Sequence, residues 1–292
     1  MKKITLITFI LIALTFSVPF LSVQGSLTVG DEFEFEVKKA YGNFNYVESA
    51  VTVTGQTDKF RVGDTAIDKG DKIDVQVDAI GTSSVDYSIF DASAVLLADI
   101  SSSSLLFGLS LLYYSVYPFL MLGISSASVQ DLDVSKGVSL GDAFYVAPPS
   151  IVWTDVYDSF NDDTNWDSLF SGFDNDEGNV TTDVTATWYD SGATIAFEID
   201  VSGRYEVAAE STGLGIIHSL RFDYNVTNYV LLGYDMFTLI SGDYQGINTN
   251  FAMTVQVTES SYTRKIGAPF LLIGLASILT VSVMVLLRKR SK

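Results

Sequence analysis

Glu32–Lys38 reads EFEFEVK, and this strict alternation of charged and apolar side chains decides the fold. Lys72–Asp78, which reads KIDVQVD, repeats the pattern. A period of two is typical of a β-strand that buries one face and exposes the other, as strands of antiparallel sheets usually do. The two stretches therefore predict a mainly β, antiparallel protein.

The same period continues through much of the chain on either side of these stretches. We expect hairpin turns at 190–192 and 202–203, because each contains a glycine, which adopts positive φ at little steric cost. The further predicted strands are 46–54, 84–90, 180–189, 193–201, 204–209, 216–226 and 250–258.

Long amphipathic helices are scarce. One short helix is expected within 150–173, where an apolar face is shared by Trp153, Val156, Phe160 and Leu169. We predict a curved antiparallel sheet, half-barrel or sandwich with a few short helices. The pattern is similar to that of lipoprotein-carrier half-barrels, in which a curved sheet wraps short helices around an apolar hollow. That similarity concerns the fold and not the function.

Composition narrows the function classes. The 292 residues include no cysteine, which excludes disulfides, thiolate metal sites and cysteine nucleophiles. Residues 26–263 hold nine of the 17 basic residues and all 35 acidic ones, so their net charge is 9 − 35 = −26. Such a surface repels nucleic acid and favours cations or basic partners. We therefore expect no nucleic-acid partner.

The N-terminus has the order of a secretory signal peptide. Lys2 and Lys3 precede an uncharged apolar run over 4–21, and Val23 and Gly25 suit a cleavage site. We predict a signal peptide over 1–25, cut after Gly25. An uncleaved N-terminal anchor is the alternative.

The C-terminus has the order of a membrane anchor. Ala268–Leu287 contains 20 residues without a charge, enough for a helix to cross a hydrocarbon core of about 30 Å. The basic residues that follow outnumber those before it, so the positive-inside rule puts the C-terminus in the cytoplasm. We predict a transmembrane helix over 264–287 and a basic tail over 288–292. The protein would lie in the cell membrane, with a two-part β-rich ectodomain, 26–135 and 136–263, outside.

A third apolar stretch lies inside the predicted ectodomain. Residues 100–130 carry no charge, and 105–124 are long enough to span a membrane. Their flanks carry Asp99, Asp131 and Asp133 without a nearby basic cluster, which favours a buried segment. A membrane-dipping element is the alternative.

Candidate catalytic residues are few. His218 is the only histidine, so Ser-His catalysis would have to use it. Residues 137–141 read GVSLG and match the nucleophile elbow around Ser139, which needs a strand, a sharp turn and a helix. Here 142–146 look like a strand instead, because 138–144 echo 27–33. A duplicated β unit is one interpretation of the echo, and the general likeness of hairpins to one another is the alternative. We therefore predict no catalytic residues.

Two further kinds of site have a sequence signal. Calcium takes oxygen ligands from acidic loops, and a candidate calcium set consists of Asp162, Asp163, Asp174, Asp176 and Glu177. A solvated acidic loop is the alternative, and no other cofactor is expected. Asn179 and Asn225 each begin an Asn-x-Thr acceptor for N-glycosylation.

Several weak motifs together carry a resemblance. They are the signal peptide, the opening VGDEFEF at 29–35, the Tyr-Asp-Ser-Gly turn at 189–192, and a C-terminal helix ending in Arg-Lys-Arg at 288–290. The chain resembles uncharacterised archaeal cell-surface ectodomains of the choice-of-anchor type. Processed anchors of such proteins carry Pro-Gly-Phe before the helix, whereas Gly267–Phe270 reads GAPF here. The resemblance implies location and architecture, and no activity.

These observations lead to one expected function and two alternatives. We expect a non-enzymatic, membrane-anchored surface protein, an adhesion or cell-envelope module that binds protein or glycan. The first alternative is a carrier or receptor for a lipid or other apolar ligand, with a cavity lined by 95–124. A surface hydrolase is the least favoured.

Overall fold

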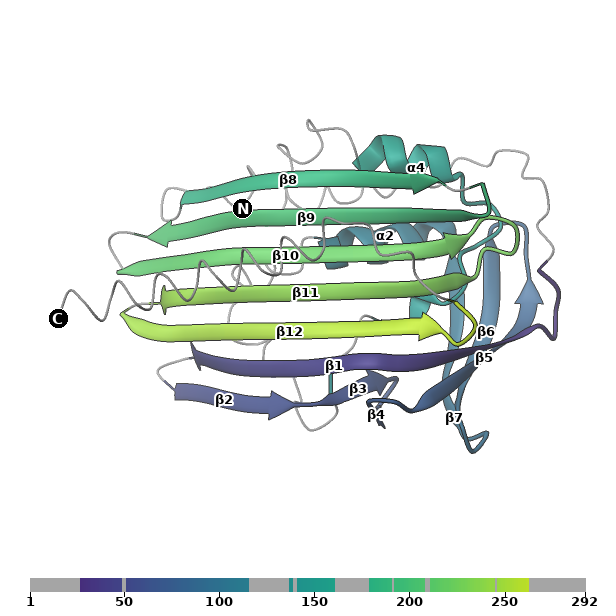
Figure 1. The fold of residues 1–292 in the computed structure, drawn as a ribbon, viewed down its shortest axis with the longest axis horizontal. Coiled ribbons are helices and arrows are strands. Elements are labelled where there is room, and N and C mark those ends of the chain that lie inside the picture. The colour runs from purple at the N-terminus through teal and green to yellow at the C-terminus, as the bar shows by residue number, and fades with distance from the viewer. Residues whose placement is uncertain are drawn as a thin grey trace. The chain divides into compact units, whose positions relative to one another are not determined.

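The strands form one ten-stranded antiparallel sheet and a separate two-stranded hairpin (Figure 1). The structure is a computed structural model that describes residues 27–48, 51–115, 137–138, 141–160, 179–190, 192–207, 211–244 and 246–262. The chain divides into two compact units, Met1–Ser260 and Ser261–Lys292, and every element below belongs to the first. The predicted mainly β, antiparallel fold is confirmed.

The large sheet is open, with β7 and β8 at its edges. In spatial order its strands are β7 (Leu96–Ser103), β6 (Ser84–Asp91), β5 (Lys72–Ile80), β1 (Glu32–Glu48), β12 (Ile247–Glu259), β11 (Leu231–Tyr244), β10 (Thr212–Asn225), β9 (Thr194–Val207) and β8 (Asn179–Asp190), and β2 (Val51–Thr57) also pairs with β1. The hairpin consists of β3 (Lys59–Val62) and β4 (Thr65–Asp68). The described helices are α2 (Ser104–Ser115), the 3₁₀ helix η3 (Asp142–Phe144) and α4 (Trp153–Phe160).

β1 joins two groups of strands. The early strands, β2 and β5–β7, come from the first part of the chain, and the late strands, β8–β12, come from its last part. The first residues of β1 pair with β5, its last residues pair with β2, and β12 lies along its other side. The register against β12 shifts between Val37 and Lys39, and the buried positions move from Val37 to Ala40. A β-bulge of this kind inserts one residue and keeps the apolar side chains on the core face beyond it.

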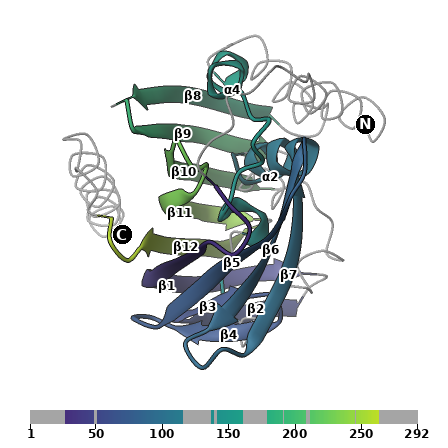
Figure 2. The same ribbon diagram turned by 90° about the vertical axis from the view of Figure 1, so that its right-hand side faces the viewer.

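The core lies on the face of the sheet that carries the helices. Figure 2 shows β5–β7 turned steeply against β8–β12, with α2 in the angle between them. Phe107 of α2 is fully buried, and its ring centroid lies 6.1 Å from that of Phe144, 6.4 Å from that of Trp153 and 5.7 Å from that of Tyr224. These rings meet edge to face, which is a favoured geometry for aromatic pairs.

The third apolar stretch contains the end of β7 and this core helix. Phe107, Leu111 and Leu112 are at most 3% exposed, while Leu105 and Leu106 on the outer side are each 42% exposed. The buried interpretation is therefore confirmed for the inner side of α2, and residues 116–130 lie outside the described residues. No helix within the described ranges is long and apolar enough to span a membrane. The segments predicted as signal peptide and transmembrane helix lie outside those ranges.

Two turn predictions have opposite outcomes. The turn at 190–192 is confirmed, because Asp190 pairs with Ile195 across the end of β8 and β9 and Gly192 has φ 81°. The prediction of a turn at 202–203 is wrong, because Gly203 lies inside β9 and pairs with the strands on both sides of it. A glycine in a central strand is held there by its neighbours' hydrogen bonds, which the local sequence does not reveal.

Three other predictions need correction. The predicted strand 46–54 contains a hairpin, since Tyr46 in β1 pairs with Val53 in β2. The predicted strand 142–146 begins as the helix η3, so the echo of 27–33 does not reproduce the same structure. β11 was not predicted, because apolar residues occupy both of its faces and hide the period of two.

The predicted helix within 150–173 is confirmed as α4, with Trp153 and Val156 buried; Leu169 lies outside the described residues.

Candidate functional site

The outward face of the early strands is acidic. Seven carboxylates project from it, and we call this set the acidic face: Glu32, Glu34, Glu36, Asp74, Asp78, Asp86 and Asp99. The alternation explains their gathering, because every second residue of β1 and β5 turns an apolar side chain to the core and a polar one to solvent. Four adjacent strands thus present one continuous polar surface.

Carboxylates on this face lie beside one another in the register. Glu34 pairs directly with Asp74 across β1 and β5. Partial burial, followed by the charges of Glu34 and Glu32, raises the pKa of Asp74 above its ordinary value, and Lys72 partly offsets this. Like charges held close together disfavour ionisation, so this face gains by contact with cations.

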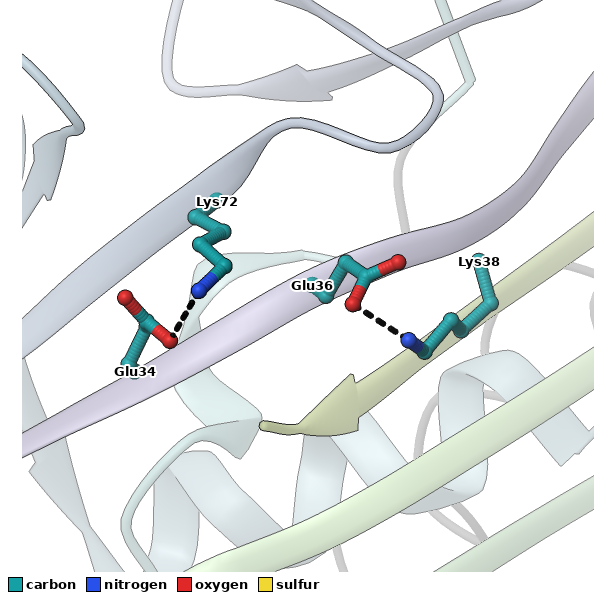
Figure 3. Close-up of polar contacts among 4 residues, drawn as sticks. All are labelled: Glu34, Glu36, Lys38 and Lys72. Carbon is teal, nitrogen blue, oxygen red and sulfur yellow. Dashed lines mark hydrogen bonds and ion pairs between the residues drawn. The ribbon is translucent and has the colours of Figure 1, made fainter. Parts of the chain in front are cut away.

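Two lysines moderate one part of the acidic face (Figure 3). Lys72 Nζ lies 2.6 Å from Glu34 Oε1, and Lys38 pairs with Glu36. All four side chains are at least 29% exposed, so water and salt screen both pairs. These two ion pairs offset part of the negative charge of β1. Neither pair includes a carboxylate of β6 or β7.

The far side of the acidic face uses serine hydroxyls instead. Ser88 Oγ lies 2.6 Å from Asp78 Oδ2 and 2.8 Å from Asp99 Oδ1, and Ser101 Oγ donates to Asp86 Oδ1 at 2.6 Å. One hydroxyl carries one proton and can donate to only one carboxylate at a time. Within the described ranges, no group of three or more His, Asp or Glu side chains is placed to hold a metal ion.

A buried ion cluster lies on β9 and β10. Arg221 Nε lies 3.0 Å from Asp223 Oδ1, and Arg221 Nη1 lies 3.5 Å from Glu198 Oε2. The three side chains are 8%, 0% and 3% exposed, respectively. We did not predict this cluster, because these charges alternate with apolar residues in the sequence, and alternation predicts an exposed strand face. Desolvation of the three charges opposes folding, and removal of one partner would leave an uncompensated buried charge.

His218 lies in β10 and faces the core. Its Nδ1 lies 2.9 Å from Thr238 Oγ1 on the neighbouring strand β11, and the residue is 1% exposed. Burial lowers the pKa of His218 to about 4, against smaller opposing contributions from the backbone of Tyr114 and Phe237. His218 is therefore neutral at pH 7 and acts as a core residue. Ser139, in the GVSLG motif that matches a nucleophile elbow, lies outside the described residues.

The buried neutral His218 predicts a loss of stability in acid. Its pKa is about 4 in the folded protein and 6.5 when unperturbed, so between these values the unfolded chain binds the proton more tightly. Lowering the pH from 6.5 to 4 should remove about 3 kcal/mol of unfolding free energy through this residue. Urea titrations of the full chain in mild detergent measure it, with His218→Gln as the control. Parallel pH profiles for the two proteins would contradict the expectation.

Tyrosines attach η3 to the sheet. Tyr87 donates to the carbonyl of Asp142 at 2.6 Å, and Tyr224 donates to the carbonyl of Phe144 at 2.7 Å. Asp142 Oδ2 in turn accepts from the backbone N–H of Gly63 at 2.9 Å. Burial raises the pKa of Asp142 and holds the pKa of each of these tyrosines well above its ordinary value. These groups are structural hydrogen-bonding partners.

The predicted binding residues fall in different places. All five candidate calcium ligands lie between 161 and 178, outside the described residues. Asn179 is the first residue of β8, where it pairs with Glu206 of β9. Asn225 is the last residue of β10, at the start of the turn into β11. The structure thus places the two glycosylation acceptors at opposite ends of the late strands.

Two of the motifs that carried the resemblance lie at the sheet, and the signal peptide and the C-terminal helix lie outside the described residues. Residues 29–35 lead into β1, and residues 189–192 close the β8–β9 hairpin. No protein-family model and no curated protein matches this chain. Function is therefore argued from the acidic face, the strand order and the sequence.

Proposed function

We propose that this chain is a membrane-anchored surface protein that acts by binding, as an adhesion or cell-envelope module. The proposal joins two features. The sequence has a predicted export signal, a predicted C-terminal anchor and a strongly acidic segment between them. The sheet gathers acidic side chains on one face that is open to a partner.

The observation that carries the proposal is the acidic face. Its seven carboxylates come from four adjacent strands, with Lys38 and Lys72 on β1 and β5 as the basic residues paired with them. A surface with this excess of one charge attracts basic partners and concentrates cations. We expect its partner to be a protein or glycan surface that presents amines or bound cations.

The position of β12 supports a protein that bears load. β12 leads to the predicted anchor and lies between β1 and β11, paired antiparallel with each. Ser260 N, just beyond β12, donates to the carbonyl of Glu34 at 2.7 Å. A pull on the C-terminus along the strand would therefore load two hydrogen-bond ladders in parallel, which suits a module that holds cells to a surface.

Adhesion of cells that express the full chain tests this proposal. We expect such cells to adhere to amine-coated beads more than cells without the chain, and external protease to remove the difference. Replacing Asp78, Asp86 and Asp99 with asparagine should lower the adhesion on the order of tenfold, since each exposed charge pair contributes modestly. Salt at about 1 M should have the same effect, because the Debye length falls to about 3 Å.

A matched variant removes the same charge elsewhere. Asp58, Asp64 and Asp71 are exposed residues around the β3–β4 hairpin, and their replacement with asparagine leaves the acidic face intact. We expect this variant to adhere almost as well as the original chain. Equal losses of adhesion for the two variants would show that net charge alone causes the effect. No loss of adhesion for either variant would show that the acidic face is not the binding surface.

A further inference from the structure

The turn between β10 and β11 begins with one of the two Asn-x-Thr acceptors, Asn225-Val226-Thr227. Asn225 Oδ1 accepts the backbone N–H of Thr227 at 2.8 Å and that of Asn228 at 3.3 Å. The backbone of Asn225 is also fixed, because its carbonyl accepts from Tyr229 N at 2.9 Å. The carboxamide of Asn225 is therefore held in one orientation by its oxygen.

Among the described residues, this arrangement leaves the amide nitrogen of Asn225 without a hydrogen-bond partner. Oδ1 and Nδ2 point in different directions from the same carbon, so an oxygen that turns inward to the backbone directs the nitrogen away from it. Asn225 is partly exposed and Thr227 is exposed. Tyr229 anchors the turn from inside, where its ring stacks on Trp153 with centroids 6.4 Å apart. The turn thus presents Nδ2 at the surface of a rigid support.

We infer that Asn225 carries an N-linked glycan, an inference that rests on the proposed export of this part of the chain. The sugar comes from a lipid-linked oligosaccharide. Asn225 Nδ2 bonds to the anomeric carbon, and the lipid phosphate or diphosphate leaves with the electrons of the broken C–O bond. The proton lost from Nδ2 passes to a base of the transferring enzyme. The product keeps Oδ1 as an acceptor, so the two hydrogen bonds that form the turn survive the modification.

The other acceptor has a different setting. Asn179 pairs with Glu206, and Thr181 of the same acceptor pairs with Arg204, so that sequence runs along β8 in the sheet. The acceptor at Asn225 instead lies mostly beyond the last pair of its strand, Asn225 with Thr194. A bulky sugar at Asn225 displaces no strand partner. The glycan would lie at the sheet end where β12 also finishes, since Gly233 pairs with both Asp223 and Thr258.

Peptide mass spectrometry of the full chain from a yeast secretory host tests the inference. Trypsin releases the peptide between Arg221 and Arg264, and Asn225 begins the only acceptor in it. We expect this peptide to gain the mass of a glycan. Thr227→Ala destroys the acceptor, and Asn225→Asp keeps a side-chain oxygen for the turn while removing Nδ2. Both variants should lose the added mass, while Thr181→Ala should retain it.

Protease protection of intact spheroplasts separates this inference from the proposed function. A protease site inserted in the exposed turn after Ser93 should be cut from outside. An exported chain whose Asn225 peptide is unmodified would overturn the glycan alone. A protected site would overturn the proposed export and the glycan with it. Added mass that persists in Thr227→Ala would also overturn the assignment to Asn225.

Discussion

Replacing Arg221 with methionine should lower the free energy of unfolding by about 3–5 kcal/mol. The change leaves the carboxylates of Glu198 and Asp223 buried without the guanidinium that lies 3.5 Å and 3.0 Å from them. An uncompensated charge in the protein interior costs far more than the loss of the pair itself. Urea denaturation of the full chain in mild detergent at pH 7 measures the difference.

The chain offers a matched control on the neighbouring strand. Arg204 of β9 pairs with Glu206 at 2.5 Å, but their side chains are 64% and 47% exposed. Arg204→Met should therefore cost under about 1 kcal/mol. Adding Glu198→Gln and Asp223→Asn to Arg221→Met should recover part of the loss, because both buried charges are then gone. Equal costs for Arg221→Met and Arg204→Met would contradict the buried cluster.

Replacing Phe107 with alanine should cost about 3–5 kcal/mol, the usual effect of removing a large aromatic side chain from a core. Phe107 is 0% exposed and contacts rings from η3, α4 and β10. The measurement tests the packing of α2, which lies within the uncharged stretch 100–130. A core helix needs Phe107, whereas a segment that leaves the fold for a membrane does not.

The outer side of α2 provides the control for Phe107. Leu105 is on the same helix and 42% exposed, so Leu105→Ala should cost under about 1 kcal/mol. The ratio of the two effects is more informative than either value, because both variants alter the same helix. A neutral Phe107→Ala, or a Leu105→Ala variant as unstable as Phe107→Ala, would contradict the packing of α2.

Hydrophobic periodicity predicted most strands and few of their connections. Phe35, Ile73 and Val75 are buried as their alternation requires, because the side-chain direction of a strand is a local property. Turns were less predictable. Gly192 has the positive φ expected of its hairpin, while Gly203 lies within a paired strand. The two glycines differ in their neighbours across the sheet and not in their own chemistry.

The candidate surfaces were predictable to different degrees. Alternating acidic residues in 32–38 and 72–78 predicted a polar face for each strand. These two strands form one acidic face with β6 and β7 because of the strand order in the sheet. The local sequence pattern does not specify that order. The buried cluster was missed for a related reason. Arg221 meets Glu198 only because β9 and β10 pair in one register, and a shift of one residue would separate them.

The sequence by itself determined that this protein is mainly β, strongly acidic over 26–263 and free of cysteine chemistry. These are properties of composition and of side-chain direction, which each segment carries with it. Only the tertiary structure decided that β1 joins the early and late strands, that α2 enters the core, and that Asn225 begins a rigid turn. Those features arise from hydrogen bonds and packing between segments far apart in the chain, and no local pattern specifies which segments meet.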